Sequence, residues 1–107
     1  MAGLFSRRFL VVNEGIEATY TPPDGSTAVV RSIIVRNAGG AAPEQYVVLC
    51  TGTGTFLATG NAPVYDSSAG EFVVHLDLRF VFYGGEALLA NGGPHISLSV
   101  SGYLFAG

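Results

Sequence analysis

The chain has 107 residues, of which 49% are hydrophobic and only 12% charged, and it carries a formal net charge of −3. This length allows one domain with a single core. Its five cations, all arginines, are too few and too scattered along the sequence for a phosphate-binding stripe, and no apolar run is long enough to span a membrane. The sequence therefore predicts neither nucleic acid nor a membrane as a partner.

The rest of the composition is typical of an all-β protein. The chain has 15 Gly and 5 Pro, which suit many turns, and its apolar residues are rich in Val, Phe and Tyr, which fit a pleated and half-buried surface. The charged fraction is about half of the roughly 25% found in an average soluble domain. With so little polar material for its surface, the protein is expected to have several faces covered by partners.

Two features bear on the compartment and on cofactors. The N-terminus MAGLFSRRFLVV has a short apolar run after its two arginines, shorter than the core of a signal peptide, so synthesis in a cytosol without secretion is expected. Cys50 is the single cysteine and lies in the apolar run YVVLCT. It cannot form an internal disulfide and is expected to be a small buried hydrophobe, and no cofactor is predicted.

Alternation with a period of two organises the first half of the chain. Strands are predicted over residues 9–13 and 16–21, followed by a tight turn at PPDGS and a strand over 28–37. Both faces of this strand are largely apolar, with Val29, Arg31, Ile33 and Val35 on one and Val30, Ser32, Ile34 and Arg36 on the other. A central strand covered by a second sheet and by a neighbouring subunit has this pattern.

The middle of the chain continues with short strands. They are predicted over 45–51 and 56–60 around the hairpin turn TGTGT, and residues 61–71 read as a surface loop. The longest predicted strand covers 71–83. Its even positions are all apolar and are assigned to the core: Phe72, Val74, Leu76, Leu78, Phe80 and Phe82.

The last strand, 95–105, follows a short strand at 87–90 and alternates without a slip. Its even positions Ile96, Leu98, Val100 and Leu104 are predicted to face the core, and its odd positions carry Ser97, Ser99, Ser101 and Tyr103. Gly102 interrupts the core-facing row and is interpreted as a bulge or a close approach of the backbone. The serines are small enough to let another sheet or subunit approach.

About eight short strands with regularly spaced turns predict a single-domain, all-β fold, an antiparallel β-sandwich that is jelly-roll-like. The sandwich domain is expected to comprise residues 9–107. Residues 1–8 are expected to form an N-terminal arm suited to lie across an adjacent subunit, since Leu4 and Phe5 are apolar and Arg7 and Arg8 basic. The alternative for this segment is an edge strand of its own domain.

The polar residues of the two long strands offer an enzymatic site as the alternative to a purely structural role. His75, Asp77 and Arg79 share one strand face, and His95 precedes the serine row, so the residue types of a Ser-His-Asp site share a sheet. A serine nucleophile, however, needs a strained turn beside free backbone amides, which the ladder of a regular strand does not offer. A metal site built from His75, Asp77 and His95 is a borderline ligand set. The sequence therefore predicts no enzyme, no catalytic residue and no metal.

Carbohydrate binding is the other class of function considered, because jelly rolls often serve as lectins. Such sites usually display exposed aromatic platforms, and the chain has no Trp but five tyrosines. Tyr65 is the best placed of them, because it falls in the predicted surface loop. It is the candidate loop contact of a carbohydrate-binding module.

Two stretches combine turn glycines with strand patterns. In DLRFVFYGGEALLANGGPHISLSVSGYLF, a strand is followed by the turn 84–86, a short strand, the turn 92–93 and a last strand that ends in Ser101, Gly102, Tyr103 and Leu104. In TYTPPDGSTAVVRSIIVRNAGG, a proline and glycine turn precedes a strand of the form V-V-R-x-I-x-V-x-N. Both stretches resemble segments of small all-β structural proteins of tailed-bacteriophage virions.

This resemblance implies a virion protein made in the host cytoplasm and present in symmetric copies that bind one another and other virion proteins. A minor protein of the neck or tail is the first expectation, and a capsid decoration or head protein is the alternative. The candidate interface residues are Leu4, Phe5, Arg7, Arg8, Arg31, Arg36, His75, Asp77, Arg79, Ser97, Ser99, Ser101 and Tyr103.

Overall fold

The computed structural model describes residues 3–37, 39, 42–63 and 74–106, with the side chains of residues 6–37, 39, 42–63 and 74–105. Within these ranges the chain forms eight strands and no helix that is long and apolar enough to cross a membrane. The strands are β1 (Gly3–Val12), β2 (Ala18–Tyr20), β3 (Thr27–Asn37), β4 (Glu44–Cys50), β5 (Thr55–Ala62), β6 (Val74–Tyr83), β7 (Leu88–Gly92) and β8 (Ile96–Ala106).

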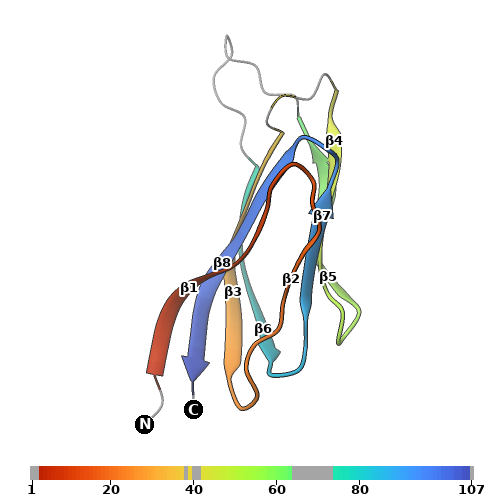
Figure 1. Ribbon diagram of the computed structural model, residues 1–107. Coiled ribbons are helices and arrows are strands. Elements are labelled where there is room, and N and C mark those ends of the chain that lie inside the picture. Colours follow the sequence, from red (N-terminus) through yellow and green to blue (C-terminus); the bar gives the residue numbers. More distant parts are fainter. Residues whose placement is uncertain (1–2, 38, 40–41, 64–73, 107) are drawn as a thin grey trace.

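The eight strands form two antiparallel sheets that pack face to face. One sheet has the order β1-β8-β3-β6 and the other the order β2-β7-β4-β5, so the chain crosses between sheets after nearly every strand (Figure 1). This order is the topology of an eight-stranded jelly roll. The predicted all-β, jelly-roll-like sandwich is therefore confirmed.

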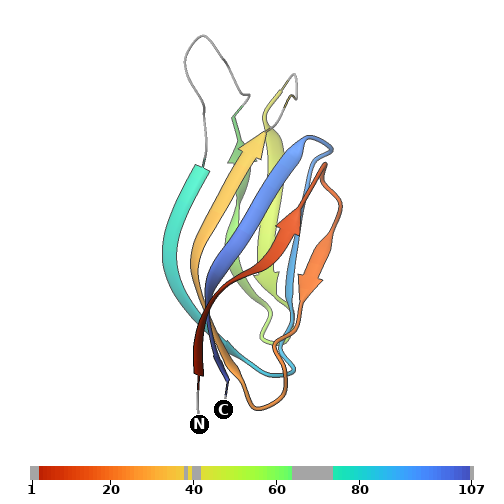
Figure 2. The same ribbon diagram turned by 60° about the vertical axis from the view of Figure 1, so that its left-hand side comes forward.

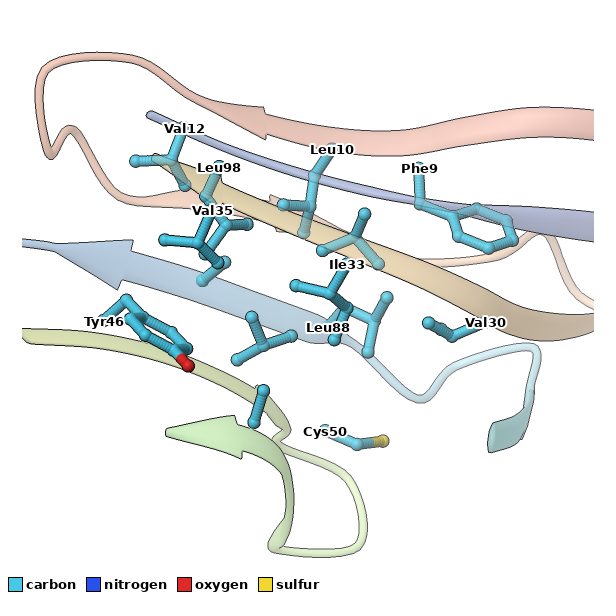
Figure 3. Close-up of a cluster of buried hydrophobic side chains, with 14 of the residues drawn as sticks. Phe9, Leu10, Val12, Val30, Ile33, Val35, Tyr46, Cys50, Leu88 and Leu98 are labelled. Carbon is cyan, nitrogen blue, oxygen red and sulfur yellow. The ribbon is translucent and has the colours of Figure 1, made fainter. Parts of the chain in front are cut away.

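The core lies between the two sheets and runs along the length of the sandwich, which measures 50 × 23 × 18 Å. Figure 3 shows its central part, to which both sheets contribute. The even positions predicted to face inward on the last strand do so, since Ile96, Leu98, Val100 and Leu104 are buried. On β6, Phe82 is fully buried, and the even positions from Val74 to Phe80 are half-buried because β6 is an edge strand.

The two strands that flank β8 in its sheet, β1 and β3, bulge at neighbouring positions. Relative to β8, β1 carries the extra residue Phe9 between the partners of Ser101 and Val100, and β3 carries the extra residue Arg31 between the partners of Gly102 and Ser101. A bulge bends its strand and increases the local twist. The sheet consequently curves at this level, which is visible in the lower half of β1 and β8 in Figure 2.

The bulge at Arg31 corrects the two faces predicted for this strand. Strict alternation placed Val29 with Ile33 and Val35, but the extra residue shifts the pattern by one position. The inward residues are instead Ala28, Val30, Ile33, Val35 and Asn37, all buried. The outward residues after the bulge are Ser32, Ile34 and Arg36. Alternation alone misses a bulge because the extra residue has no side-chain signature of its own.

Gly102 is a site of close backbone approach, as predicted. A Cβ atom on Gly102 would lie 1.9 Å from the carbonyl oxygen of Val29, a distance that no side chain tolerates. The bulge itself lies on the neighbouring strands rather than on β8. Glycine is therefore the residue that lets β3 approach β8 at this level.

The segment expected to be an arm is the first half of a strand. Residues 3–8 belong to β1 and pair with β8 from Gly3 opposite Ala106 to Arg8 opposite Ser101. No element boundary falls between residues 8 and 9, and β1 is an edge strand of its own sheet. This arrangement is the one that the sequence left as the alternative.

Candidate functional site

The candidate site is the outer face of the β1-β8-β3-β6 sheet, the face turned away from the core. Cross-strand rows define it. Val11 and Ile34 both pair with Ser99. In the next row Arg8 and Ser32 both pair with Ser101, and in the row after that Tyr103 pairs with Val29. The outer-face residues are Ser6, Arg8, Val11, Thr27, Val29, Ser32, Ile34, Arg36, His75, Asp77, Arg79, Val81, Tyr83, Ser97, Ser99, Ser101, Tyr103 and Phe105.

A shallow groove of about 260 Å³ follows β8 on this face. Because β8 carries serines where its neighbours carry larger side chains, Ser97 and Ser99 form the floor. The residues lining it from the flanking strands are Arg8 and Val11 from β1 and Ile34 and Arg36 from β3. The row of hydroxyls is therefore the bottom of a trough between two higher strands.

The outer face also holds most of the exposed apolar side chains. Of the seven large hydrophobic residues exposed in the described part of the chain, five lie here: Val11, Ile34, Tyr83, Tyr103 and Phe105. Tyr83 is the most open of the five, with 57% of its surface exposed. Large apolar groups gathered on one face mark an interaction surface, whereas single scattered ones are ordinary.

The fold gathers cations that are scattered in the sequence. All five arginines lie in strands of this sheet, two in β1, two in β3 and one in β6. Of the six acidic residues in the described ranges, only Asp77 lies in the same sheet. The others are in turns or in β4: Glu14, Glu17, Asp24, Glu44 and Glu86. One sheet is therefore basic, and the acidic groups lie around it.

Ser32, His75 and Asp77 form a polar cluster at the β6 edge of the outer face. The Ser32 hydroxyl lies 3.2 Å from His75 Nε2, and Asp77 Oδ1 lies 3.3 Å from the same nitrogen. In a Ser-His-Asp triad the serine and the aspartate contact opposite ring nitrogens, so that one accepts a proton while the other is held. Here both partners share Nε2, and the side chains of His75 and Asp77 are 53% and 82% exposed. This geometry is that of a solvated surface cluster.

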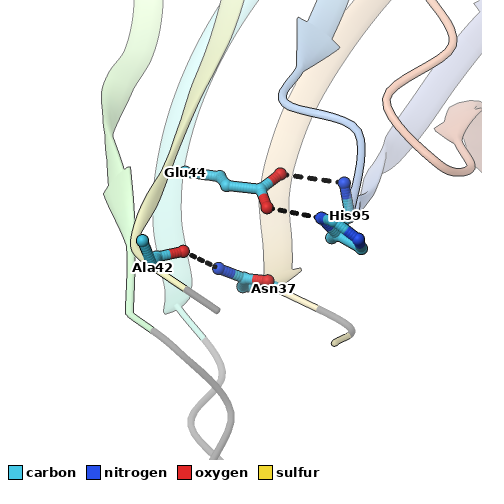
Figure 4. A network of polar contacts seen from close by, with 4 residues as sticks. All are labelled: Asn37, Ala42, Glu44 and His95. Carbon is cyan, nitrogen blue, oxygen red and sulfur yellow. Dashed lines mark hydrogen bonds and ion pairs between the residues drawn. The ribbon is translucent and has the colours of Figure 1, made fainter. Parts of the chain in front are cut away.

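Glu44 and His95 form a second polar contact, at the end of the sandwich (Figure 4). Glu44 Oε1 accepts the backbone N–H of His95 at 2.8 Å, and Oε2 lies 2.6 Å from His95 Nδ1. An ionised carboxylate only accepts, so Nδ1 carries the hydrogen. These contacts, above all the backbone hydrogen bond, lower the pKa of Glu44. The pair ties the start of β4 to the turn between β7 and β8.

The predicted site residues divide into those that the outer face collects and those that lie elsewhere. Arg8, Arg36, His75, Asp77, Arg79, Ser97, Ser99, Ser101 and Tyr103 all lie on it. Arg31 is exposed in the bulge, and the guanidinium of Arg7 lies over the ring of Tyr20, 5.3 Å from its centroid. The side chains of Leu4 and Phe5, and the whole of Tyr65, fall outside the described residues, so the carbohydrate-binding alternative stays a prediction.

Sequence reasoning missed several outer-face residues. Ser32 was not among the predicted site residues, and alternation grouped it with Val30, Ile34 and Arg36 without indicating that His75 lies beside it. Val11 was not singled out as exposed because it stands in the apolar run FLVV, which reads as core. Within the described residues, no three His, Cys, Asp or Glu side chains gather as a metal site would require. Glu44 was missed altogether, since its partner is fifty-one positions away in the sequence.

Comparison with models of protein families and with curated proteins gives no match. Solved structures do match, all at low identity. The NLP-core of Drosophila, described for pentamer formation and histone binding, has a TM-score of 0.55 at 10% identity, covering 96% of this chain and 95% of that one. The nucleoplasmin-like N-terminal domain of Drosophila FKBP39 has a TM-score of 0.51 at 16% identity, covering 97% and 89%.

A viral protein matches as well. A protein chain from the virus-like particle of the extra small virus of the prawn Macrobrachium rosenbergii has a TM-score of 0.53 at 10% identity, and the match covers 99% of this chain and 80% of that one. At such identities the similarity extends to the fold alone. The chain therefore shares its fold with a protein of a viral particle and with these two Drosophila domains.

Proposed function

We propose that this chain is a structural subunit of a virus particle, which assembles in symmetric copies and contacts other virion proteins through its outer face. Within that role we place it at the neck or tail of a tailed phage, with capsid decoration as the nearest alternative position. The turn and strand motifs around Gly84–Glu86 and Ser101–Leu104 support the phage assignment.

The observation that carries the proposal is the concentration of exposed apolar groups on the outer face. Five of the seven exposed large hydrophobic residues of the described chain lie on this one sheet. A monomer gains nothing from leaving Tyr83, Tyr103 and Phe105 in water, whereas a subunit buries them on assembly. The low charged fraction of 12% has the same explanation.

The fold gives further support. The same sandwich occurs in the virus-like particle of the prawn virus and in the Drosophila NLP-core, which forms pentamers. A fold by itself does not define a function. It supports the proposal because the outer face of this particular chain has the composition that assembly requires.

We also propose that the chain is not an enzyme. The nearest arrangement to a catalytic group, Ser32 with His75 and Asp77, has both partners on one ring nitrogen and stands in solvent. Ser32 also lies on the flat of a strand that is paired on both sides, not on a strained turn of the kind that presents a nucleophile. Its histidine is not oriented by a carboxylate on the opposite ring nitrogen.

The test combines oligomeric state with particle assembly. Native mass spectrometry of the purified protein at micromolar concentration is expected to show one closed oligomer. Electron microscopy of particles made without the gene is expected to show a missing collar or a failure to join tails, and adding the purified protein is expected to restore them. Missing knobs on the head would move the protein to the decoration position.

Two results would overturn the proposal. One is a stable monomer that also fails to attach to particles lacking it. The other is reproducible binding on a glycan array that is lost in Tyr65→Ala, together with intact particles in the absence of the gene. That second pair of results would assign the chain to carbohydrate binding instead.

A further inference from the structure

The turn between β1 and β2, residues 13–17, presents an apolar side chain between two acids. Ile16 is 68% exposed, more than any other large hydrophobic residue in the described part of the chain. Glu14 and Glu17 stand on either side of it in the sequence, and neither has an ion-pair partner among the described residues. We call these five residues the β1–β2 turn.

The β1–β2 turn is held rigidly against the body of the protein. Gly15 donates its N–H to the carbonyl of Ile96 at 3.0 Å, and Ile16 donates to the carbonyl of Asn13 at 3.0 Å. Gly15 has a φ of 71° and packs so closely that a Cβ would lie 2.2 Å from the carbonyl oxygen of Gly93. A turn fixed in this way loses little conformational entropy when it binds.

The groove on the outer face has the complementary pattern. Val11 and Ile34 flank Ser99 from both sides and are 38% and 40% exposed, so the middle of the groove is apolar with a small residue beneath. Arg8 lines the same groove and has no ion-pair partner among the described residues. The groove thus offers an apolar slot beside the cation Arg8. The β1–β2 turn offers the apolar side chain of Ile16 beside two carboxylates, so the two surfaces are complementary.

We propose that the β1–β2 turn of one copy docks into the groove of the next copy. Ile16 enters between Val11 and Ile34 above Ser99, and the carboxylates of Glu14 and Glu17 lie toward Arg8. This inference rests on the proposed assembly and specifies its contact. It also gives a role to the serine row, whose small side chains leave room for the incoming turn.

The occupant is a second copy because one chain carries both halves of the contact. The chain's own turn cannot fill its own groove, since it is bonded to Ile96 and packed on Gly93. Glu14 and Arg36 line one pocket of the same molecule. However, Glu14, Glu17 and Arg8 form no ion pair among the described residues, and the docked neighbour pairs them. With only five cations, the sheet has little to offer a phosphate backbone.

The contact joins two different surfaces, so it is heterologous and generates a ring if the rotation closes. The β1–β2 turn lies at the end of the sandwich opposite the termini (Figure 2). The groove is lined by the half of β1 that leads into this turn, including Val11. A rotation axis parallel to the long axis of the sandwich keeps every part of a subunit at its own height. An axis of this orientation therefore allows the turn of one subunit to reach the groove of its neighbour at the same height.

Charge reversal provides the test. Arg8→Glu, and separately Glu14→Arg with Glu17→Arg, are expected to raise the dissociation constant of the oligomer at least about tenfold, because each places like charges in contact. The triple variant is expected to recover assembly, since both halves are then reversed. Asp24→Arg, in the exposed turn between β2 and β3 and outside both the groove and the outer face, is the matched charge-reversal control and is expected to assemble as the wild type does.

A second pair of variants tests the apolar half. Ser99→Leu fills the floor of the groove and is expected to block assembly, whereas Thr59→Leu, on the outer face of the other sheet, is expected to leave it intact. Sedimentation velocity reports the oligomer, and circular dichroism with thermal unfolding verifies that each variant is folded.

Each alternative outcome is distinct. A wild-type oligomer that tolerates Arg8→Glu and Ser99→Leu would overturn this contact and leave the proposed assembly standing. A monomeric wild type would overturn the contact, and a monomer that also fails to attach to particles lacking it would overturn the proposed assembly as well. If instead a duplex DNA binds the wild type and Arg8→Glu abolishes that binding without affecting the oligomer, the groove serves nucleic acid and the contact is wrong.

Discussion

Gly102 shows how one residue can decide the geometry of a whole sheet. It lies on β8 between Arg7 of β1 and Val30 of β3, at the level where both neighbouring strands bulge. The absence of a side chain lets the Val29 carbonyl occupy the space where a Cβ would stand. The bend of the sheet, and with it the position of every outward residue beyond the bulge, depends on that space.

Gly102→Ala is therefore expected to destabilise the fold by about 3 kcal/mol, since the strands must separate to admit the methyl group. Ser101→Ala, the neighbouring change on the outer face, is expected to alter stability by less than about 0.5 kcal/mol. Urea unfolding of both variants measures the difference. An unchanged midpoint for Gly102→Ala would show that β3 moves aside without cost and that the glycine is not required.

Glu44 is a residue through which pH acts on the fold. Its pKa is lowered by hydrogen bonds from His95, so the ionised carboxylate stabilises the folded state. That contribution is complete above the pKa of an unfolded glutamate, about 4.3, and is lost as the pH falls through the lowered folded value.

Glu44→Gln is accordingly expected to lose less stability than the wild type when the pH is taken from neutrality to below about 4.3. Asp24→Asn, which removes an exposed carboxylate that has no hydrogen bond among the described residues, is expected to lose as much as the wild type. Urea midpoints across this pH range provide the measurement. Parallel curves for wild type and Glu44→Gln would contradict the assigned role of the pair.

At the scale of the element, β3 shows where alternation fails. Its residues are strong strand formers, and the strand was predicted within one residue of its observed bounds. Its faces were not predicted correctly, because inserting Arg31 as an extra residue moves Ile33 to the side of Val30. The regular strand β8 was predicted correctly on both faces, because nothing interrupts its period of two.

Adjacent isoleucines of β3 test this assignment. Ile33 is fully buried and Ile34 is 40% exposed on the outer face. Ile33→Ala is expected to cost about 2–5 kcal/mol by leaving a cavity, and Ile34→Ala about 1 kcal/mol or less. Thermal or urea unfolding at low protein concentration measures both, so that assembly does not contribute. Equal costs would place both side chains in the core and refute the bulge register.

At the scale of the whole molecule, the jelly-roll order brings distant strands together. β1 and β8 come from opposite ends of the chain and pair along nearly their full length. This pairing builds the groove from residues around positions 8–11, 34–36 and 97–99. It also collects all five arginines on one sheet and leaves most acids in the turns. The resulting separation of charge is what orients one copy against the next in the proposed contact.

The sequence by itself determined the class of fold, the positions of most strands, the inward rows of β6 and β8, and the need for a small residue at 102. These follow from local chemistry, since alternation, turn glycines and β-branched residues act over a few positions. Only the tertiary structure decided the bulges, the partnership of Ser32 with His75, the Glu44 contact and the groove. Each of these depends on which strands lie side by side and in which register, and pairing between distant segments leaves no mark in either segment alone.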